Sequence, residues 1–449
     1  MTNRNIEWHR KKLEQIRERL ESGQLNAVRE LLPNDVIEKA CEDCKYYFRT
    51  RLLTPLVVVF HMISAGISRE KSFQSAWHLN GQTRQSGSLA KARKRLPLEI
   101  WERIHAWMMQ EIDNENLVES RWRGHRVIGV DGTCVSMSDE SELFEHFGRR
   151  WGNYGYARFP LARVLVAFDL HTMIQLDHKV GGYQTDETEL LRDLIPQLRR
   201  GDILVADRHF AGANLYAEYQ AAGMEFITRV HQALEVERLK VVEIFSENDR
   251  LVEMKISPQH RRKNPDFPET IQARVIKTRA KIRGQRQEFW IATSFLDARE
   301  YPAAEIQRWL KKRWKVEGLI EELKVWLGAD VLRSKSVKGI FKELHARIIG
   351  LNLIHWLILK AAAKHHRDPQ RLSVAATLRL TTAQSLKMST SPAWQLPVLF
   401  EELLDRIAFS IVPDRPNRIE PRMIKREKKA YDSLKISRSK WRLLNALAA

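Results

Sequence analysis

The sequence is poor in cysteine, with three such residues in a chain of 449. So few thiols indicate a reducing, cytosolic setting. Cys41 and Cys44 form one C-x-x-C pair, but no second ligand pair follows at the spacing of a structural zinc site. We therefore expect neither a structural zinc ion nor a redox role for this pair.

Long hydrophobic runs are missing as well. The most apolar stretch, LLTPLVVVFHMISAGI (52–67), contains a proline and a histidine and is short for a bilayer span. It predicts a buried helix or helix pair, so no membrane partner is expected. The opening residues, MTNRNIEWHRKKLEQ, are charged throughout and predict no signal peptide. The expected location is the cytoplasm.

Acidic residues are too few to balance the basic ones. The chain has 56 Asp and Glu against 75 Lys and Arg, which gives a net charge of +19. An excess of this size indicates a polyanionic partner, and nucleic acid is the usual one. The basic residues are clustered, and thirteen Trp supply flat rings that also suit DNA. The alternative is a merely basic protein with no such partner.

The length predicts about three domains, and the residue patterns divide the chain into five segments. Residues 1–120 are predicted to be a helical DNA-binding region. Residues 121–231 alternate strand and helix patterns, which predicts a mixed α/β sheet with one antiparallel side, and residues 299–365 complete this core. Residues 232–298 have the period of two typical of a β-rich insertion, and residues 366–449 form a basic, helical C-terminal region.

Two of the predicted strands deliver a carboxylate. RVIGVDGTCVSM places Asp131 among apolar residues, where an unpartnered charge is costly to bury. ILVADRHF places Asp207 directly after a second apolar run. Carboxylates of neighbouring strands repel, and one takes up a proton unless a cation lies between them. Mg²⁺ and Mn²⁺ prefer oxygen ligands of this kind, so a divalent metal is the simplest partner.

A third ligand is expected from the helix LKKRWKVEGLIEELK. On a regular helix Arg313, Glu317 and Lys324 share one face. Glu317 can complete the metal site, while Arg313 and Lys324 hold the phosphates that flank the cut. Two other acids on this helix compete for the ligand role, Glu321 and Glu322. The alternative is an ordinary Arg–Glu pair on a helix surface.

A short basic helix is predicted over SGSLAKARKRLP (86–97), with Ser88 as its cap and Pro97 just beyond its end. Its exposed face is expected to carry four cations, which are Lys91, Arg93, Lys94 and Arg95. Such a helix can enter a DNA groove or lie along phosphates, and a solvated surface helix is the equal alternative.

In this order the motifs resemble those of DDE transposases, and more narrowly the insertion-sequence-four family of cut-and-paste bacterial elements. IGVDGT and LVADRHF resemble the first and second acid motifs of that family. LKKRWKVEGLIEELK resembles its signature Tyr-x2-Arg-x3-Glu-x6-Lys, with Leu310 at the Tyr position and Trp309 beside it. PRMIKREKKAYDSLK is similar to the family's basic C-terminal segment, and the resemblance runs from about residue 84 to 438.

The resemblance implies an RNase H-like core, a mixed five-stranded sheet with helices, which the β-rich insertion interrupts. The helical N-terminal and basic C-terminal regions flank it. The resemblance also implies that Asp131, Asp207 and Glu317 are catalytic and hold two Mg²⁺ (or Mn²⁺) ions per active site. Trp290 in the insertion is the best-placed residue for stacking on a flipped base, and a core aromatic is its alternative.

The implied function is a DNA transposase that binds terminal inverted repeats and performs metal-dependent cleavage and strand transfer through a hairpin. The implied partners are double-stranded DNA of the inverted repeats and of the target, and a second copy in a homodimeric synaptic complex at the nucleoid. Two rival functions stay open, a catalytically idle DNA-binding repressor and an RNase H-fold nuclease without strand transfer. The presence of all three acids disfavours the first, and the insertion and the Arg-Glu-Lys helix disfavour the second.

Overall fold

The structure is a computed structural model, and it describes residues 26–49, 52–67, 73–79, 87–117, 121–152, 155–156, 159–231, 233–282, 285–413, 441 and 443–444. The chain forms two compact units. The helical unit comprises residues 1–117, 135–162 and 323–449, and the sheet unit comprises residues 118–134 and 163–322. The start of the predicted N-terminal region (1–25) and the basic motif at 421–435 lie outside the described residues.

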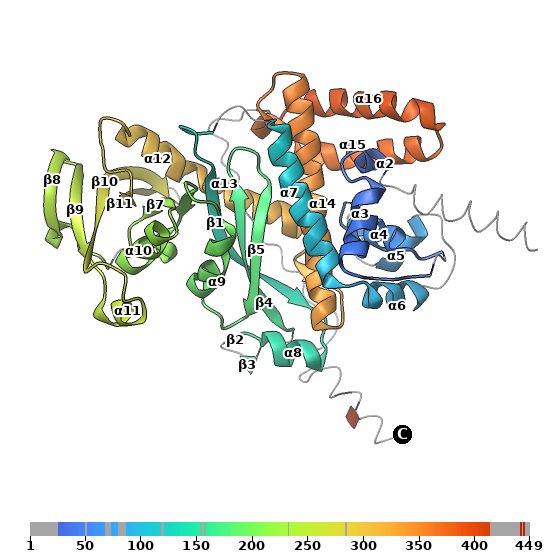
Figure 1. Ribbon diagram of the computed structural model, residues 1–449, viewed down its shortest axis with the longest axis horizontal. Coiled ribbons are helices and arrows are strands. Elements are labelled where there is room, and N and C mark those ends of the chain that lie inside the picture. Colours follow the sequence, from blue (N-terminus) through green and yellow to red (C-terminus); the bar gives the residue numbers. More distant parts are fainter. Residues whose placement is uncertain are drawn as a thin grey trace, which may run out of the picture. The chain divides into compact units, whose positions relative to one another are not determined.

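A mixed sheet forms the centre of the sheet unit, with strands in the order β5-β4-β1-β6-β7 (Figure 1). The bounds are β1 Val127–Met137, β4 Leu161–Asp169, β5 Gln175–Gly182, β6 Ile203–Ala206 and β7 Glu225–Arg229. Strands β1, β6 and β7 are parallel, and a short turn joins β4 to β5 in a hairpin. This is the predicted five-stranded sheet of an RNase H-like core, and the predicted fold class is confirmed.

The insertion continues this sheet rather than forming a layer of its own. Its strands are β8 Lys240–Ser246, β9 Asp249–Lys255, β10 Thr270–Ile282 and β11 Gln285–Thr293, paired antiparallel in chain order. Strand β11 then pairs antiparallel with β7, with Ile291 opposite Arg229. The full order therefore runs on from β7 to β11, β10, β9 and β8.

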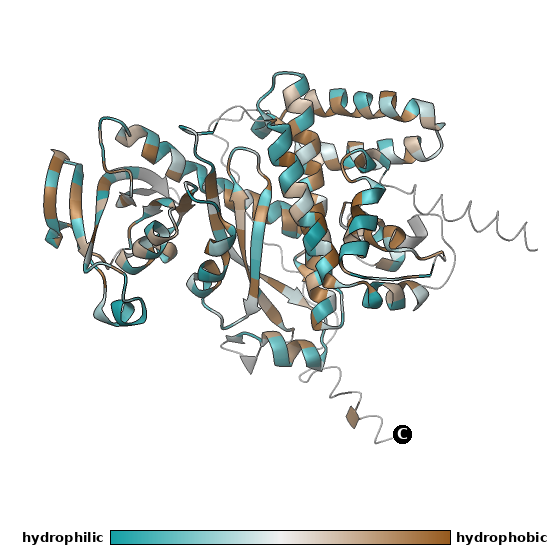
Figure 2. Cartoon of the chain, viewed as in Figure 1, coloured by the Kyte–Doolittle hydropathy of each residue, from teal (hydrophilic) through white to brown (hydrophobic). Residues whose placement is uncertain are grey.

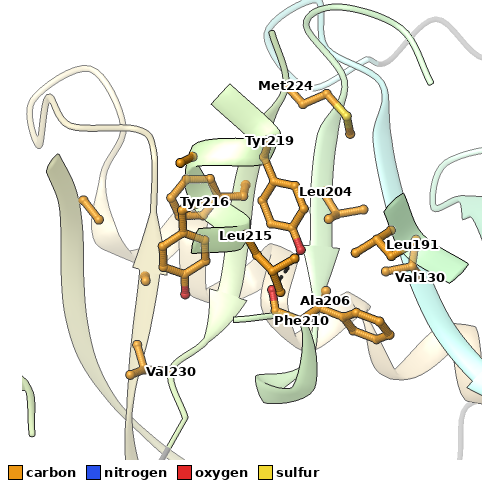
Figure 3. Packing of buried hydrophobic residues seen from close by; sticks show 14 of the residues in the cluster. Val130, Leu191, Leu204, Ala206, Phe210, Leu215, Tyr216, Tyr219, Met224 and Val230 are labelled. Carbon is orange, nitrogen blue, oxygen red and sulfur yellow. Dashed lines mark hydrogen bonds between the residues drawn. The ribbon is translucent and has the colours of Figure 1, made fainter. Parts of the chain in front are cut away.

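Two helices of the sheet unit, α9 (Glu187–Leu194) and α10 (Ala213–Ala221), cover the core shown in Figure 3. Asp186 caps α9, because its carboxylate accepts a hydrogen bond from the Thr188 N–H. The ring of Tyr216 stacks on Phe226 with the centroids 4.1 Å apart. The Tyr219 hydroxyl donates to the carbonyl oxygen of Phe210 at 2.9 Å, which fixes the 3₁₀ turn η2 (Arg208–Phe210).

The remaining elements of the sheet unit are short. They are η1 Ile195–Gln197, η3 Val236–Arg238, α11 Pro258–Lys263, α12 Ala303–Lys312 and α13 Trp314–Glu321. Helix α13 continues into the helical unit as a π-helical turn, η4 (Glu322–Trp326).

The helical unit is built around α14 (Val337–Lys364), which packs against α4 (Pro55–Ile67), α7 (Leu98–Glu115) and α16 (Leu396–Ala408). Its other elements are α2 Asn26–Arg29, α3 Asn34–Asp43, α5 Phe73–Leu79, α6 Gly87–Arg95, α8 Ser141–Phe147, β2 Trp151–Gly152, β3 Gly155–Tyr156, β12 Val331–Leu332, η5 Pro369–Arg371, α15 Val374–Ser389 and η6 Ala393–Gln395.

Two apolar helices of this unit, α4 and α14, lie in its core. Helix α4 is buried along its whole length, as predicted for the apolar stretch. Helix α14 is long and apolar enough to cross a membrane by length and composition, but 89% of its most apolar window is buried inside the fold. In Figure 2, hydrophobic residues (brown) recur along α14 among polar ones. The pattern is therefore that of a core helix.

A buried charged cluster fixes the start of α14. Glu343 has no exposed surface and accepts hydrogen bonds from the N–H of Arg333 and from the N–H and hydroxyl of Ser334. The buried Arg347 lies 3.7 Å from its carboxylate. The ammonium group of Lys342 donates to the carbonyls of Arg93 and Lys94, which ties the C-terminal end of α6 to α14.

Two details predicted for the basic helix are wrong. Helix α6 begins at Gly87, so Ser88 lies inside its first turn and does not cap it. Arg93 is not on the exposed face, because its guanidinium lies 3.4 Å from the ring centroid of Phe73. Burial lowers the pKa of Arg93 to about 10. Lys91, Lys94 and Arg95 are exposed.

Candidate active site

Asp131 and Asp207 lie side by side on neighbouring strands. Strands β1 and β6 are parallel with Gly129 opposite Val205, and each aspartate follows its partnered residue by two positions. The Asp131 carboxylate accepts a hydrogen bond from the Gly132 N–H at 2.8 Å. The Asp207 carboxylate accepts one from the His209 N–H at 2.8 Å, which begins the turn η2. Both side chains are partly buried.

The site is rich in negative charge. The pKa of Asp131 is raised to about 6, mainly by burial; the charges of Asp207 and Glu187 add to the rise, and the Gly132 N–H and Arg313 oppose it. The net rise shows that burial and the two neighbouring carboxylates outweigh the groups that stabilise the ionised carboxylate. A cation brought to Asp131 would therefore be stabilised there.

Arg313 links Asp131 to Glu317. One guanidinium nitrogen lies 3.5 Å from a carboxylate oxygen of Asp131, and another lies 3.4 Å from Glu317. The Glu317 side chain is 62% exposed. Within the described ranges, no three His, Cys, Asp or Glu side chains are close enough together to hold a metal ion. Arg313 is thus the counter-ion of two of the predicted ligands, and the surface pair considered as an alternative is one half of this bridge.

Helix α13 can approach β1 only because residue 129 is a glycine. A Cβ atom on Gly129 would lie 2.4 Å from Val316 and 2.8 Å from Leu170, well inside van der Waals contact. Val316 is buried and directly precedes Glu317. The glycine in IGVDGT therefore sets the distance between the strand that carries Asp131 and the helix that carries Glu317.

Gly129→Ala is accordingly expected to lower the strand-cleavage rate about 10²-fold, because a displacement of about an ångström costs this much at a reacting centre. Cleavage of an end fragment would be measured beside the thermal midpoint. Gly318→Ala on α13 is the matched control, since a Cβ atom at that position would have no neighbour within 4 Å. A Gly129→Ala protein that cleaves at the normal rate would show that this contact does not set the site.

Glu187 belongs to the site and was missed from sequence. A Cβ atom on Gly132 would lie 2.2 Å from the carboxylate carbon of Glu187, so this carboxylate rests on the backbone beside Asp131. The Arg163 guanidinium lies 3.2 Å from the same carboxylate. From sequence, Glu187 was only an acid in the first turn of a helix. The usable signal was the glycine directly after Asp131, which leaves room for a neighbour.

Two arginines near Asp207 were also missed. Burial lowers the pKa of Arg229, the positive charges of Arg208 and Arg313 lower it further, and Asp207 opposes them. Arg208 and Arg313 therefore both lie within electrostatic reach of Arg229, as Asp207 does. Such a group of arginines is suited to the phosphates of a nucleic acid strand.

The position of Lys324 relative to Arg313 and Glu317 cannot be taken from regular helical spacing. It falls in the π-helical turn η4, where side chains no longer repeat as on a regular helix, and it belongs to the helical unit. Glu322 opens the same turn, and Glu321 is the exposed last residue of α13. The role predicted for Lys324 stays a prediction.

The aromatic candidates are held by neighbours. The Trp290 indole is partly buried against the core of the sheet unit and donates to Glu237 at 3.2 Å. The Arg250 guanidinium lies 4.7 Å from the centre of its ring. At the family's Tyr position, Leu310 and its neighbour Trp309 are both buried. Neither supplies a hydroxyl group, so the phosphate contact of that Tyr has no equivalent at these two positions.

Comparison with known proteins shows which proteins the chain resembles. Residues 122–353 match the family described as the transposase DDE domain. The chain is 23% identical over 344 residues to the transposase InsG for insertion sequence element IS4 of Escherichia coli (strain K12), covering 75% of this chain and 76% of that protein. A cryo-EM structure of the piggyBac transposase synaptic complex with hairpin DNA overlaps 89% of this chain and 87% of its own at 10% identity, but with a TM-score of 0.42.

The family match spans more than half of the chain, and the chain therefore belongs to the transposase DDE domain family. Together with the IS4 relative, this confirms the predicted membership of the insertion-sequence-four type. The chain is a DNA transposase, as its motifs predicted.

Proposed function

We propose that this transposase binds the terminal inverted repeats of its own element, cleaves the DNA there and joins the freed ends to a target. The observation that carries the proposal is that Asp131, within β1, and Asp207, directly after the neighbouring parallel strand β6, stand at matching positions, with Glu317 linked to Asp131 through Arg313. All three acids stand in the motifs that resemble the family's catalytic motifs.

The three acids would hold Mg²⁺ or Mn²⁺, two ions per active site. Carboxylate oxygens are the ligands these ions prefer, and the crowding of Asp207 and Glu187 on Asp131 is relieved by a bound cation. When bound, the ions activate the attacking oxygen and stabilise the leaving oxygen of an in-line displacement. Without the ions, Arg313 contacts Asp131 and Glu317. It must therefore release them when these two acids bind the ions.

The cations of the chain would position the DNA. Once released, Arg313 is suited to a phosphate next to the cut, and Arg229 and Arg208 lie around Asp207 for the adjacent phosphates. The ammonium group of Lys324 would contact a further phosphate of the cleaved DNA strand. Lys91, Lys94 and Arg95 on α6 would bind the end sequence, whereas Arg93, which packs on Phe73, supports the helix instead.

The proposed route passes through a hairpin on the transposon end, and Trp290 would stack on the flipped base. Trp290→Ala is then expected to leave the first nick unchanged and to lower hairpin formation about tenfold, since stacking on one base contributes about 1–3 kcal/mol. Denaturing gels resolve nicked from hairpin product. Trp290→Phe keeps an aromatic face and is the matched control. Equal loss of both products would instead indicate damage to the insertion.

Assembly and location follow from the reaction. Cleaving two ends together requires at least two active sites, so we propose a homodimer on DNA, acting at the bacterial nucleoid in the cytoplasm. Residues 1–120 and 366–449 would be its DNA-binding regions and residues 232–298 its insertion domain, with the core formed by 121–231 and 299–365.

The deciding experiment uses the full chain and a labelled fragment of the element's end. Nicking that requires Mg²⁺ or Mn²⁺ and stops with a chelator is expected, followed by joining of pre-cleaved ends to a target plasmid. Tight binding without nicking would identify an idle repressor. Nicking without joining would identify a nuclease of the same fold. Either result would overturn the proposal.

A further inference from the structure

An open pocket of about 830 Å³ lies in the helical unit, between the segment that follows α3 and the exposed face of α6. One wall is the run Tyr46–Arg49, three aromatic residues and an arginine. The opposite wall carries Ser88, Lys91 and Arg95, whose spacing of three and four residues places them on one face of α6. Apolar residues complete the lining, among them Leu52, Leu53, Leu89 and Leu96.

The aromatic wall is open to solvent. The rings of Tyr46 and Phe48 stack with their centroids 6.1 Å apart. Tyr47 is 89% exposed and Phe48 is 43% exposed. Large rings gathered in water mark an interaction site, because burying them elsewhere in the fold would be favourable.

Both walls are held in place. The chain leaves α3 through Lys45, which has a φ of 51°, and the Tyr46 N–H donates to the Cys41 carbonyl at 2.8 Å. This is the reversal common at helix C-termini, and it fixes the direction of the aromatic run. Helix α6 is held by the Lys342 ammonium group at its C-terminal end. A ligand would therefore meet a site that is already formed.

The charges of the pocket select an anion. The charged side chains among its described lining residues are Arg49, Lys91 and Arg95, all of them cations. Arg95 also lies close enough to Tyr46 to oppose the rise in the pKa of its hydroxyl that burial causes. Cations beside flat rings fit a nucleotide chain, with phosphates on the cations and bases on the rings. Paired bases present only their edges in the grooves, so ring faces require unpaired bases.

We propose that this pocket binds an unpaired stretch of DNA, with bases stacked on Tyr47 and Phe48 and phosphates held by Lys91, Arg95 and Arg49. The inference rests on the proposed function, because cleavage and hairpin formation at the element's end create unpaired strands. It assigns the aromatic run a role that duplex binding by α6 does not include.

The test measures binding of the full chain to an oligodeoxythymidine of about twelve nucleotides and to a blunt duplex end fragment, at several salt concentrations. The double variant Tyr47→Ala, Phe48→Ala is expected to bind the oligonucleotide at least tenfold more weakly, with the salt dependence unchanged and duplex binding retained. Lys91→Ala with Arg95→Ala is expected to reduce the salt slope by about 0.7 for each lost phosphate contact. Trp394→Ala, which removes an exposed ring elsewhere in the unit, is the control.

The outcomes separate the pocket from the enzyme. A wild-type chain that ignores the oligonucleotide, or an aromatic double variant with normal affinity and a normal melting curve, overturns the pocket while leaving end cleavage untouched. Equal losses for oligonucleotide and duplex would show a duplex-binding surface and also overturn it. Failure of the wild-type chain to bind or cut the end fragment would refute the proposed function, whereas ring-dependent binding of oligodeoxythymidine would still support the pocket.

Discussion

Asp207→Asn is expected to lower strand cleavage ~10³-fold or more while end binding is retained, because the loss of a ligand to the catalytic ions removes several kcal/mol of transition-state stabilisation. Asp131→Asn should have the same effect, since the two carboxylates lie on paired strands. Cleavage would be followed on a labelled end fragment in Mg²⁺, and binding by anisotropy without metal. The amide keeps the shape of each side chain, so the fold should persist.

The control for this pair is Asp193→Asn, a change of the same kind at an exposed position on α9. It is expected to cleave at the wild-type rate. If the Asp207 variant nicked DNA as fast as this control, the assignment of the acids would be wrong, and the chain's activity would have to come from another site.

Glu343→Leu is expected to cost the helical unit about 3–5 kcal/mol, because it leaves Arg347 as a buried charge without its carboxylate and removes the acceptor of three hydrogen bonds. The thermal midpoint should fall by roughly 10 °C. Thermal and urea unfolding would measure the loss.

Adding Arg347→Met should recover part of this stability, since removing both partners of a buried pair costs less than removing one. Glu402→Leu serves as the control, because its pair with Lys387 is exposed to solvent and exposed pairs contribute little to stability. A single Glu343→Leu variant as stable as this control would mean that the buried cluster does not hold α14.

The strands and the two aspartates could be predicted because their signals are local. Each acid is marked by an apolar run directly before it, residues 127–130 before Asp131 and Ile203–Ala206 before Asp207, and these runs define the two strands. Parallel pairing then brings Asp131 and Asp207 together without any further information. The period of two in residues 232–298 was equally clear, and the segment forms four strands, β8 to β11.

The features that sequence did not give depend on contacts between distant segments. Glu187 joins the site only because Gly132 leaves space for it, and Arg93 turns inward only because Phe73 lies beneath it. Lys324 was placed by counting along a regular helix, and the π-helical turn breaks that count. Arg313 has the predicted spacing from Glu317, but its contact with Asp131 requires the packing of α13 on β1 at Gly129.

The pairing of β11 with β7 also bears on how the chain tolerates shortening. Deleting the insertion would remove β11 and make β7 an edge strand. Its backbone N–H and C=O groups on that side would then have no partners. An unpaired edge strand pairs readily with strands of other molecules. The shortened protein should therefore aggregate rather than act as a minimal nuclease. The insertion therefore protects the edge of the central sheet, in addition to any contact it makes with DNA.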